Sequence, residues 1–182
     1  MNWERTVSWL GMFAVLGGAL RALMAPAAAI WGTDSMQELV PGLIACFLMA
    51  IGSLGLWFGQ LPRIGMIGGA GFLLLSFGNM MTACLVWSTM TGAPGDGQAA
   101  ELLQMVNNVA SSVGLLISSI ATIRSGLLPR WAAVLLLVWP FLSFLPYVAD
   151  WVTLLWGLSY VGLGLPVWLG QRERASSFSV KG

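Results

Sequence analysis

Histidine is absent from this chain of 182 residues, and charged side chains make up only 8% of it. Without histidine, the chain lacks the usual ligand of haem and of most catalytic zinc sites, and the common base of a hydrolytic triad. A soluble domain carries roughly a quarter charged residues. This chain has too little polar surface to cover a water-soluble globule, so a soluble, histidine-dependent enzyme is excluded.

Other chemical signatures are missing too. No glycine-rich phosphate loop of the GxxxxGK[ST] type occurs. No pair of carboxylates falls inside an apolar run, so a proton relay has no evident members. The serines have no basic partner at a motif spacing, and no basic-aromatic surface suggests nucleic acid. We therefore expect a non-catalytic protein with no cofactor, no metal site and no nucleic-acid partner.

Cysteine is scarce, and both copies, Cys46 and Cys84, lie inside apolar runs. Measured from the turn between those runs, near residue 60, they lie at different depths, so a disulfide between them is not expected. Small buried apolar residues are the simpler interpretation of both.

What the chain does contain is apolar sequence, because 58% of its residues are hydrophobic. Several runs approach or exceed the ~20 residues that cross a bilayer as a helix. The pattern predicts an all-α, polytopic transmembrane bundle of six helices forming a single domain over residues 1–182. The predicted spans are about 7–24, 36–58, 63–87, 100–123, 129–148 and 151–169. The first run also resembles a secretory signal peptide, but its length favours a retained helix.

Local signals place several boundaries. Ser35 and Glu38 fit a capping box at the start of the second span. A cluster of glycine and proline over residues 92–97 predicts a loop. Pro140 lies inside the fifth span and predicts a kink, because proline removes a helical hydrogen bond.

One segment occurs twice, at residues 59–77 and 126–144. Gly59, Leu61, Pro62 and Arg63 recur at one constant offset as Gly126, Leu128, Pro129 and Arg130, each time before a long apolar run. Two explanations stay open. In the first, a helical hairpin was duplicated in parallel, so that spans two and three correspond to spans four and five. In the second, Leu-Pro-Arg suits the start of a helix and occurs twice independently.

Basic residues sort to one set of span ends. That set contains Arg5, Arg63, Arg124, Arg130, Arg172, Arg174 and Lys181. The other set holds Asp34, Glu38, Asp96, Glu101 and Asp150, with Arg21 nearby. Since positive loops mark the cytoplasmic side, both termini are predicted to be cytoplasmic, in a bacterial inner membrane. Tryptophans near both sets of ends suit the two headgroup layers, while Trp9, Trp139 and Trp156 are expected to pack deeper.

Polar and small residues follow two of the spans. In span 63–87, Gly65 and Gly69 form a GxxxG step that would let another backbone approach. Span 100–123 carries the widest polar stripe and is expected to be the most enclosed. These side chains are either interhelical hydrogen-bonding groups or the lining of a ligand pocket. In the second case the ligand-binding residues would be Arg21, Asn79, Asn107, Asn108 and Ser111, all in the outer half.

Arg21 is expected either to reach the outer headgroups or to pair with a carboxylate, because a lone charge in the bilayer is costly. The candidate ion-pair partners are Glu38, Glu101 and Asp150. An approach to one of these would anchor an outer polar vestibule.

Two functions are consistent with these patterns. The first is an accessory or structural subunit that packs against other membrane proteins, lipids or pigments within the lipid bilayer. The second is a protein that binds or transports a small molecule through an outer-half polar pocket. A continuous cavity bounded by Arg21 and the asparagines would favour the second function, and a filled centre would favour the first.

Overall fold

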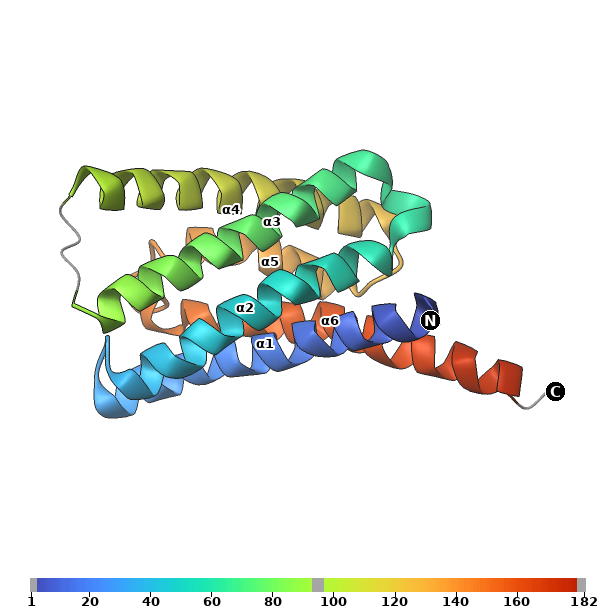
Figure 1. Cartoon of the computed structure of the whole chain (residues 1–182), viewed down its shortest axis with the longest axis horizontal. Helices are drawn as coiled ribbons and strands as arrows, with labels where there is room; N and C mark the ends of the chain where they lie inside the picture. Colours follow the sequence, from blue (N-terminus) through green and yellow to red (C-terminus); the bar gives the residue numbers. More distant parts are fainter. Residues whose placement is uncertain (1–2, 93–96, 180–182) are drawn as a thin grey trace.

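The computed structural model of this chain describes residues 3–92 and 97–179, without the side chains of Pro62, Asp150 and residues 171–179. Within these ranges the regular structure is entirely helical, which confirms the predicted all-α transmembrane bundle (Figure 1). The elements are α1 (Trp3–Trp31), α2 (Met36–Phe58), α3 (Leu61–Met90), α4 (Gln98–Ser125), α5 (Arg130–Leu142), the 3₁₀ turn η1 (Ala149–Trp151) and α6 (Val152–Ser179).

The helices form a closed ring in chain order. Each packs against the helix before and after it, and α1 closes the ring through an extensive contact with α6. Successive helices run in opposite directions, so the α2–α3 and α4–α5 connections lie at the same end of the bundle as both chain ends (Figure 1). Arg63 and Arg130, each beside one of these connections, therefore lie on one side of the membrane.

Five of the described helices, α1 to α4 and α6, are long and apolar enough to cross a membrane. The exception is α5, which was predicted to continue to residue 148 but ends at Leu142 after 13 residues. Its length is roughly 20 Å, against about 30 Å of hydrocarbon. Pro140, predicted to kink the helix, lies two residues before its end, and the Ser143 hydroxyl then bonds the Pro140 carbonyl oxygen. The helix thus ends within one turn after the proline.

The second span was placed correctly, from Met36 to Phe58, but its capping box forms only in part. The Glu38 Oε2 atom accepts a hydrogen bond of 2.8 Å from the Asp34 backbone N–H. The Ser35 hydroxyl has no partner among the described residues. Glu38 therefore stabilises the α1–α2 turn one residue earlier than predicted.

Glycines set the closest helix crossings. A Cβ atom built on Gly18 of α1 would lie 2.6 Å from the Gly157 carbonyl oxygen of α6. On the other side of α1, a Cβ atom on Gly17 would lie 2.8 Å from the Met49 backbone nitrogen of α2. Between α3 and α4, a Cβ atom on Gly114 would lie 2.5 Å from the Leu75 backbone nitrogen. The backbones of these helices are nearly in contact.

The predicted GxxxG step of Gly65 and Gly69 is not one of these crossings. Gly65 has φ 58° and ψ −163°, values outside the helical region, and kinks α3 at a point open to its surroundings. Gly69 receives the Trp57 indole rather than another backbone, since a Cβ atom there would lie 2.5 Å from the ring. The left-handed φ explains why glycine occupies position 65.

The polar stripe on α4 faces inward as predicted, with Ala110, Gly114, Ser118 and Thr122 all buried. However, α4 is the least buried of the five long helices, and α2 is the most buried. The prediction that α4 is the most enclosed helix was therefore wrong. One of its two ring neighbours is the short α5, which leaves much of α4 uncovered.

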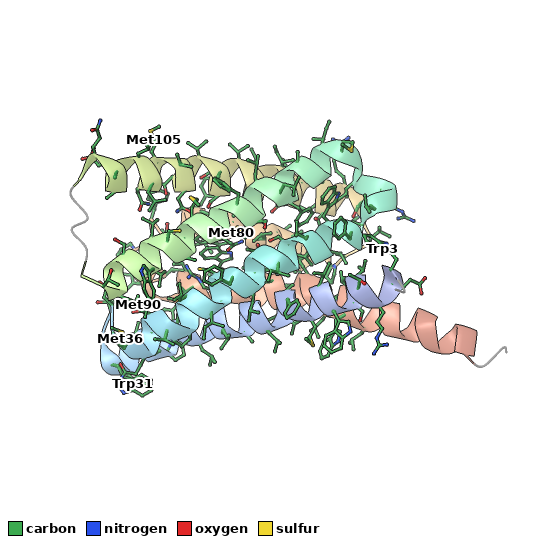
Figure 2. The ribbon with its side chains drawn as sticks, viewed as in Figure 1. Trp3, Trp31, Met36, Met80, Met90 and Met105 are labelled. Atoms are coloured by element: carbon green, nitrogen blue, oxygen red, sulfur yellow. The ribbon has the colours of Figure 1, made fainter. Side chains whose placement is uncertain are left out.

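Tryptophans mark both ends of the bundle. Trp3 lies at the end that holds the termini, and Trp31 at the opposite end (Figure 2). Trp139 and Trp156 pack inside as predicted, but Trp9 is 48% exposed and faces outward. Fully buried side chains fill the interior, the largest being Tyr160, Phe72, Met49, Leu56, Leu75 and Leu136.

Candidate functional site

Arg21 is the charged residue at the centre of the candidate site, and only 7% of its side chain is exposed. Its Cζ atom lies 4.1 Å from the centre of the Trp156 ring, and its Nη1 atom donates to the Cys46 Sγ atom at 3.7 Å. Trp156 in turn stacks on Trp139, with ring centres 4.6 Å apart. Side chains of α2 and α6 thus lie against the guanidinium, and it is buried inside the bundle.

The three carboxylates that were predicted to pair with Arg21 lie in different surroundings. The Glu38 Oε2 atom is hydrogen-bonded to the Asp34 backbone N–H at the α1–α2 turn. Glu101 lines a groove between α3 and α4. The side chain of Asp150 lies outside the described residues, so its pairing stays a prediction. Among the described side chains, the only hydrogen bond of Arg21 is the one to Cys46, and its Nε atom has no partner.

The surroundings of Arg21 can stabilise a buried cation. An arginine is attracted to the face of an indole, and the attraction strengthens when water is excluded. Cys46 supplies only a weak acceptor. The arrangement therefore holds a cation inside the bundle through an aromatic ring and a thiol, and it leaves the Nε–H without a hydrogen-bond partner among the described residues.

Tyr160 is the centre of a second buried cluster, which joins three helices. Asn79 of α3 donates through Nδ2 to the Tyr160 hydroxyl at 3.0 Å, and Ser53 of α2 lies 2.8 Å from the same hydroxyl. The Ser53 hydroxyl proton goes to the Met49 carbonyl oxygen. Tyr160 therefore donates to Ser53 and accepts from Asn79.

Sequence reasoning found Asn79 in this cluster but missed Ser53 and Tyr160. The available signal was Tyr160 itself, one of only two tyrosines in the chain, in the middle of an apolar run. A tyrosine buried in that position needs a hydrogen-bond partner for its hydroxyl.

The other predicted ligand-binding residues lie apart from Arg21 and Asn79. The Asn107 Oδ1 atom of α4 accepts from Thr82 of α3 at 3.0 Å and from Ser111 at 3.4 Å. Asn108 accepts from Gln104 at 3.0 Å on the exposed side of α4. The five residues thus belong to four separate groups. Asn79 and Asn107 make hydrogen bonds between helices, as the first of the two interpretations expects.

A third polar cluster, which the sequence did not suggest, joins the first copy of the repeated turn to the last turn of α4. Gln60 is fully buried; its Nε2 atom donates to Thr122 at 3.3 Å, and its Oε1 atom accepts from Ser125 at 2.9 Å. Arg63 donates through Nη1 to the Ser125 carbonyl oxygen at 3.2 Å. The α2–α3 connection is therefore hydrogen-bonded to the end of α4.

Two grooves follow the α3–α4 seam, one at each end. The outer groove has a volume of about 860 Å³, and its polar lining residues include Ser88, Thr89, Glu101, Gln104 and Asn108. The inner groove, of about 470 Å³, is lined by Arg63, Arg124 and apolar side chains. Neither groove includes Arg21, Asn79 or Tyr160.

Within residues 3–92 and 97–179, no three histidine, cysteine or carboxylate side chains are placed to hold a metal ion. Comparison with protein-family models, with curated proteins and with solved structures found no match for this chain. The apolar helices define the class, an integral membrane protein of the helical-bundle type. A more specific function has to be argued from the geometry.

Proposed function

We propose that this chain is a non-catalytic accessory subunit that packs against another membrane protein. The observation that carries the proposal is the early end of α5. Residues 143–148 follow it as a series of turns, in which Phe144 is 83% and Tyr147 is 92% exposed. Phe141 and Leu145 are exposed on either side of Phe144.

The depth of this segment matters. The first residue of α5, Arg130, lies at the end of the bundle that holds the other arginine-bearing turn, and the helix covers roughly two thirds of the hydrocarbon. The α5–α6 connection turns back before it reaches the far end of the bundle (Figure 1). Residues 143–148 therefore fall within the outer third of the membrane.

Lipid is a poor cover for such a segment. Backbone that is not helical is tolerated at membrane depth only where protein covers it or water fills a cavity. Large aromatic side chains are also the common anchors of protein interfaces. A transmembrane helix of a partner protein would satisfy both requirements by lying against Phe144 and Tyr147.

The interior supports a packing role. Several of the buried polar groups are bonded to one another in local clusters, and large apolar side chains fill the space between them. This corresponds to the filled centre expected of a subunit. Of the predicted ligand-binding residues, the two α3–α4 grooves include only Asn108.

The second candidate function, binding of a small, mostly uncharged molecule, rests on the outer α3–α4 groove. Its volume of about 860 Å³ lies within the range of known ligand sites. Ser88, Thr89, Gln104 and Asn108 would supply hydrogen bonds there. Only Asn108 comes from the predicted ligand-binding set.

A photo-crosslinking amino acid at Tyr147, in the native membrane, tests the subunit role. We expect a crosslink to one discrete membrane protein, whereas the same group at Phe47, which is exposed on α2, should give lipid adducts only. The double variant F144A/Y147A should lose the partner from native mass spectra after mild detergent extraction, and F47A should keep it. A monomer that carries a small ligand would favour the second function instead.

A further inference from the structure

The inner α3–α4 groove brings two positive charges together beside an apolar channel. Arg63 of α3 and Arg124 of α4 both line it, with Ile64, Ile67, Leu116 and Ile120 among the apolar residues. Both arginines are exposed. The groove thus combines a cationic end with an apolar wall that opens to the surroundings of the bundle.

One hydrogen bond holds Arg63 in place. Its guanidinium donates to the carbonyl oxygen of Ser125, the residue next to Arg124. The α3 kink at Gly65 lies two residues after Arg63, and Ile67 beyond it is 78% exposed beside the groove. The first turn of α3 is therefore fixed against the end of α4, although both carry a positive charge.

The presence of Arg63 and Arg124 at one groove favours the binding of an anion there. Like charges at one site repel unless a counter-charge lies between them, and the described lining of the groove contains no carboxylate. Guanidinium groups bind phosphate through two parallel hydrogen bonds. Arg63 uses one of its five N–H donors for Ser125, so donors remain for a phosphate.

We propose that this groove is a binding site for an anionic phospholipid. The phosphate lies between Arg63 and Arg124, and one acyl chain lies along Ile64, Leu116 and Ile120. The apolar wall favours a membrane lipid over a free phosphate ion. The sorting of basic residues to this end places the groove at the cytoplasmic leaflet, where anionic lipids interact with basic pockets between helices.

The test uses the full-length chain in detergent micelles, with dioleoyl phosphatidylglycerol as the probe and dioleoyl phosphatidylcholine as its neutral counterpart. Native mass spectrometry counts the bound lipid. We expect selective retention of phosphatidylglycerol. R124Q should weaken it about fivefold, the usual effect of one basic side chain at an anionic surface. R63Q should act similarly, but it also removes the bond to Ser125, so R124Q is decisive if R63Q fails to fold.

Matched controls separate the site from general attraction. R130Q removes an exposed arginine at the same end, outside the groove lining, and should leave retention within twofold. I120W fills the apolar wall and should reduce retention, whereas V113W, two turns away on the same exposed face, should not. Equal retention of both lipids, equal losses in R130Q and R124Q, or displacement of the lipid by inorganic phosphate at equal concentration would each overturn the proposal.

Discussion

The Arg21 guanidinium lies against the face of Trp156, with 4.1 Å between its Cζ atom and the ring centre, inside the helical bundle. This contact joins α1 to α6, the pair of helices that closes the ring. Replacing Arg21 with lysine or with methionine separates the contributions of its shape and its charge to stability.

We expect R21K to lower the thermal stability in detergent more than R21M does. Lysine keeps the charge but loses the planar stacking, whose loss costs about 2 kcal/mol at a desolvated site. Methionine removes the desolvation penalty of a buried cation and fills a similar volume. Thermal unfolding of the two variants and the wild type checks the order. An R21K protein as stable as wild type would show that the ring contact contributes nothing.

Y160F removes the hydroxyl shared by Ser53 and Asn79. It leaves the Asn79 amide with one bond fewer in a buried place. We expect a loss of about 0.5–1.5 kcal/mol in the free energy of unfolding, typical of one interhelical hydrogen bond in a membrane. Y147F makes the same chemical change at an exposed position and should have no effect. Equal losses in the two variants would contradict the role given to the cluster.

G18A places a methyl group against the Gly157 carbonyl oxygen, so α1 and α6 must move apart. We expect a destabilisation of about 1–3 kcal/mol, as for other overpacked contacts. G170A, in α6 with open space around the added carbon, should be neutral or slightly stabilising because alanine favours the helix. Chemical unfolding of both variants is the measurement, and a neutral G18A would argue against the close crossing.

Q60L breaks the hydrogen bonds that join the first repeated turn to the last turn of α4, and it leaves the Thr122 hydroxyl without the bond from Gln60. We expect a loss of about 1–3 kcal/mol, the cost of unsatisfied buried groups. Q104L removes an exposed bond to Asn108 and should change the stability by less than about 0.5 kcal/mol. Comparable losses of stability in Q60L and Q104L would mean that the buried cluster contributes no more to stability than an exposed hydrogen bond.

The orientation of the bundle is checked by labelling cysteines with a membrane-impermeant maleimide. Cys46 is buried and Cys84 is exposed, so only Cys84 needs replacement beforehand. We expect L127C, in the α4–α5 turn, to react only from the cytoplasmic side, and D34C, in the α1–α2 turn, only from the outer side. Labelling of both from one side would contradict the alternating path of the chain.

The sequence predicted the helices and their alternation because each depends on local patterns. An apolar run, preceded by the capping-box pattern of Ser35 and Glu38 and followed by a turn near residue 60, identified α2 from Met36 to Phe58. The end of α5 was missed because a mid-run proline can kink a helix or end it, and the surrounding packing decides which. Gly65 was assigned to packing because its left-handed φ cannot be read from a glycine spacing.

The site was less accessible to sequence reasoning, since each of its contacts joins residues far apart in the chain. Asn79 and Asn107 could be identified as polar groups inside a membrane, but Tyr160 and Thr82, their partners, could not. The same holds for Arg21, whose carboxylate partners were sought by depth, whereas an indole of α6 and a thiol of α2 lie against it. These residue pairs are decided by which helix faces meet in the ring.

The 13 residues of α5 also bear on how the protein enters the membrane during synthesis. A segment of that length falls short of the ~20 residues that the insertion machinery accepts as an independent span. We therefore expect α5 to stay in the translocon until the ribosome has made most of α6. The helices α5 and α6 would then enter the membrane together as one hairpin. The slowest step of biogenesis would then come last, when this hairpin closes the ring against α1.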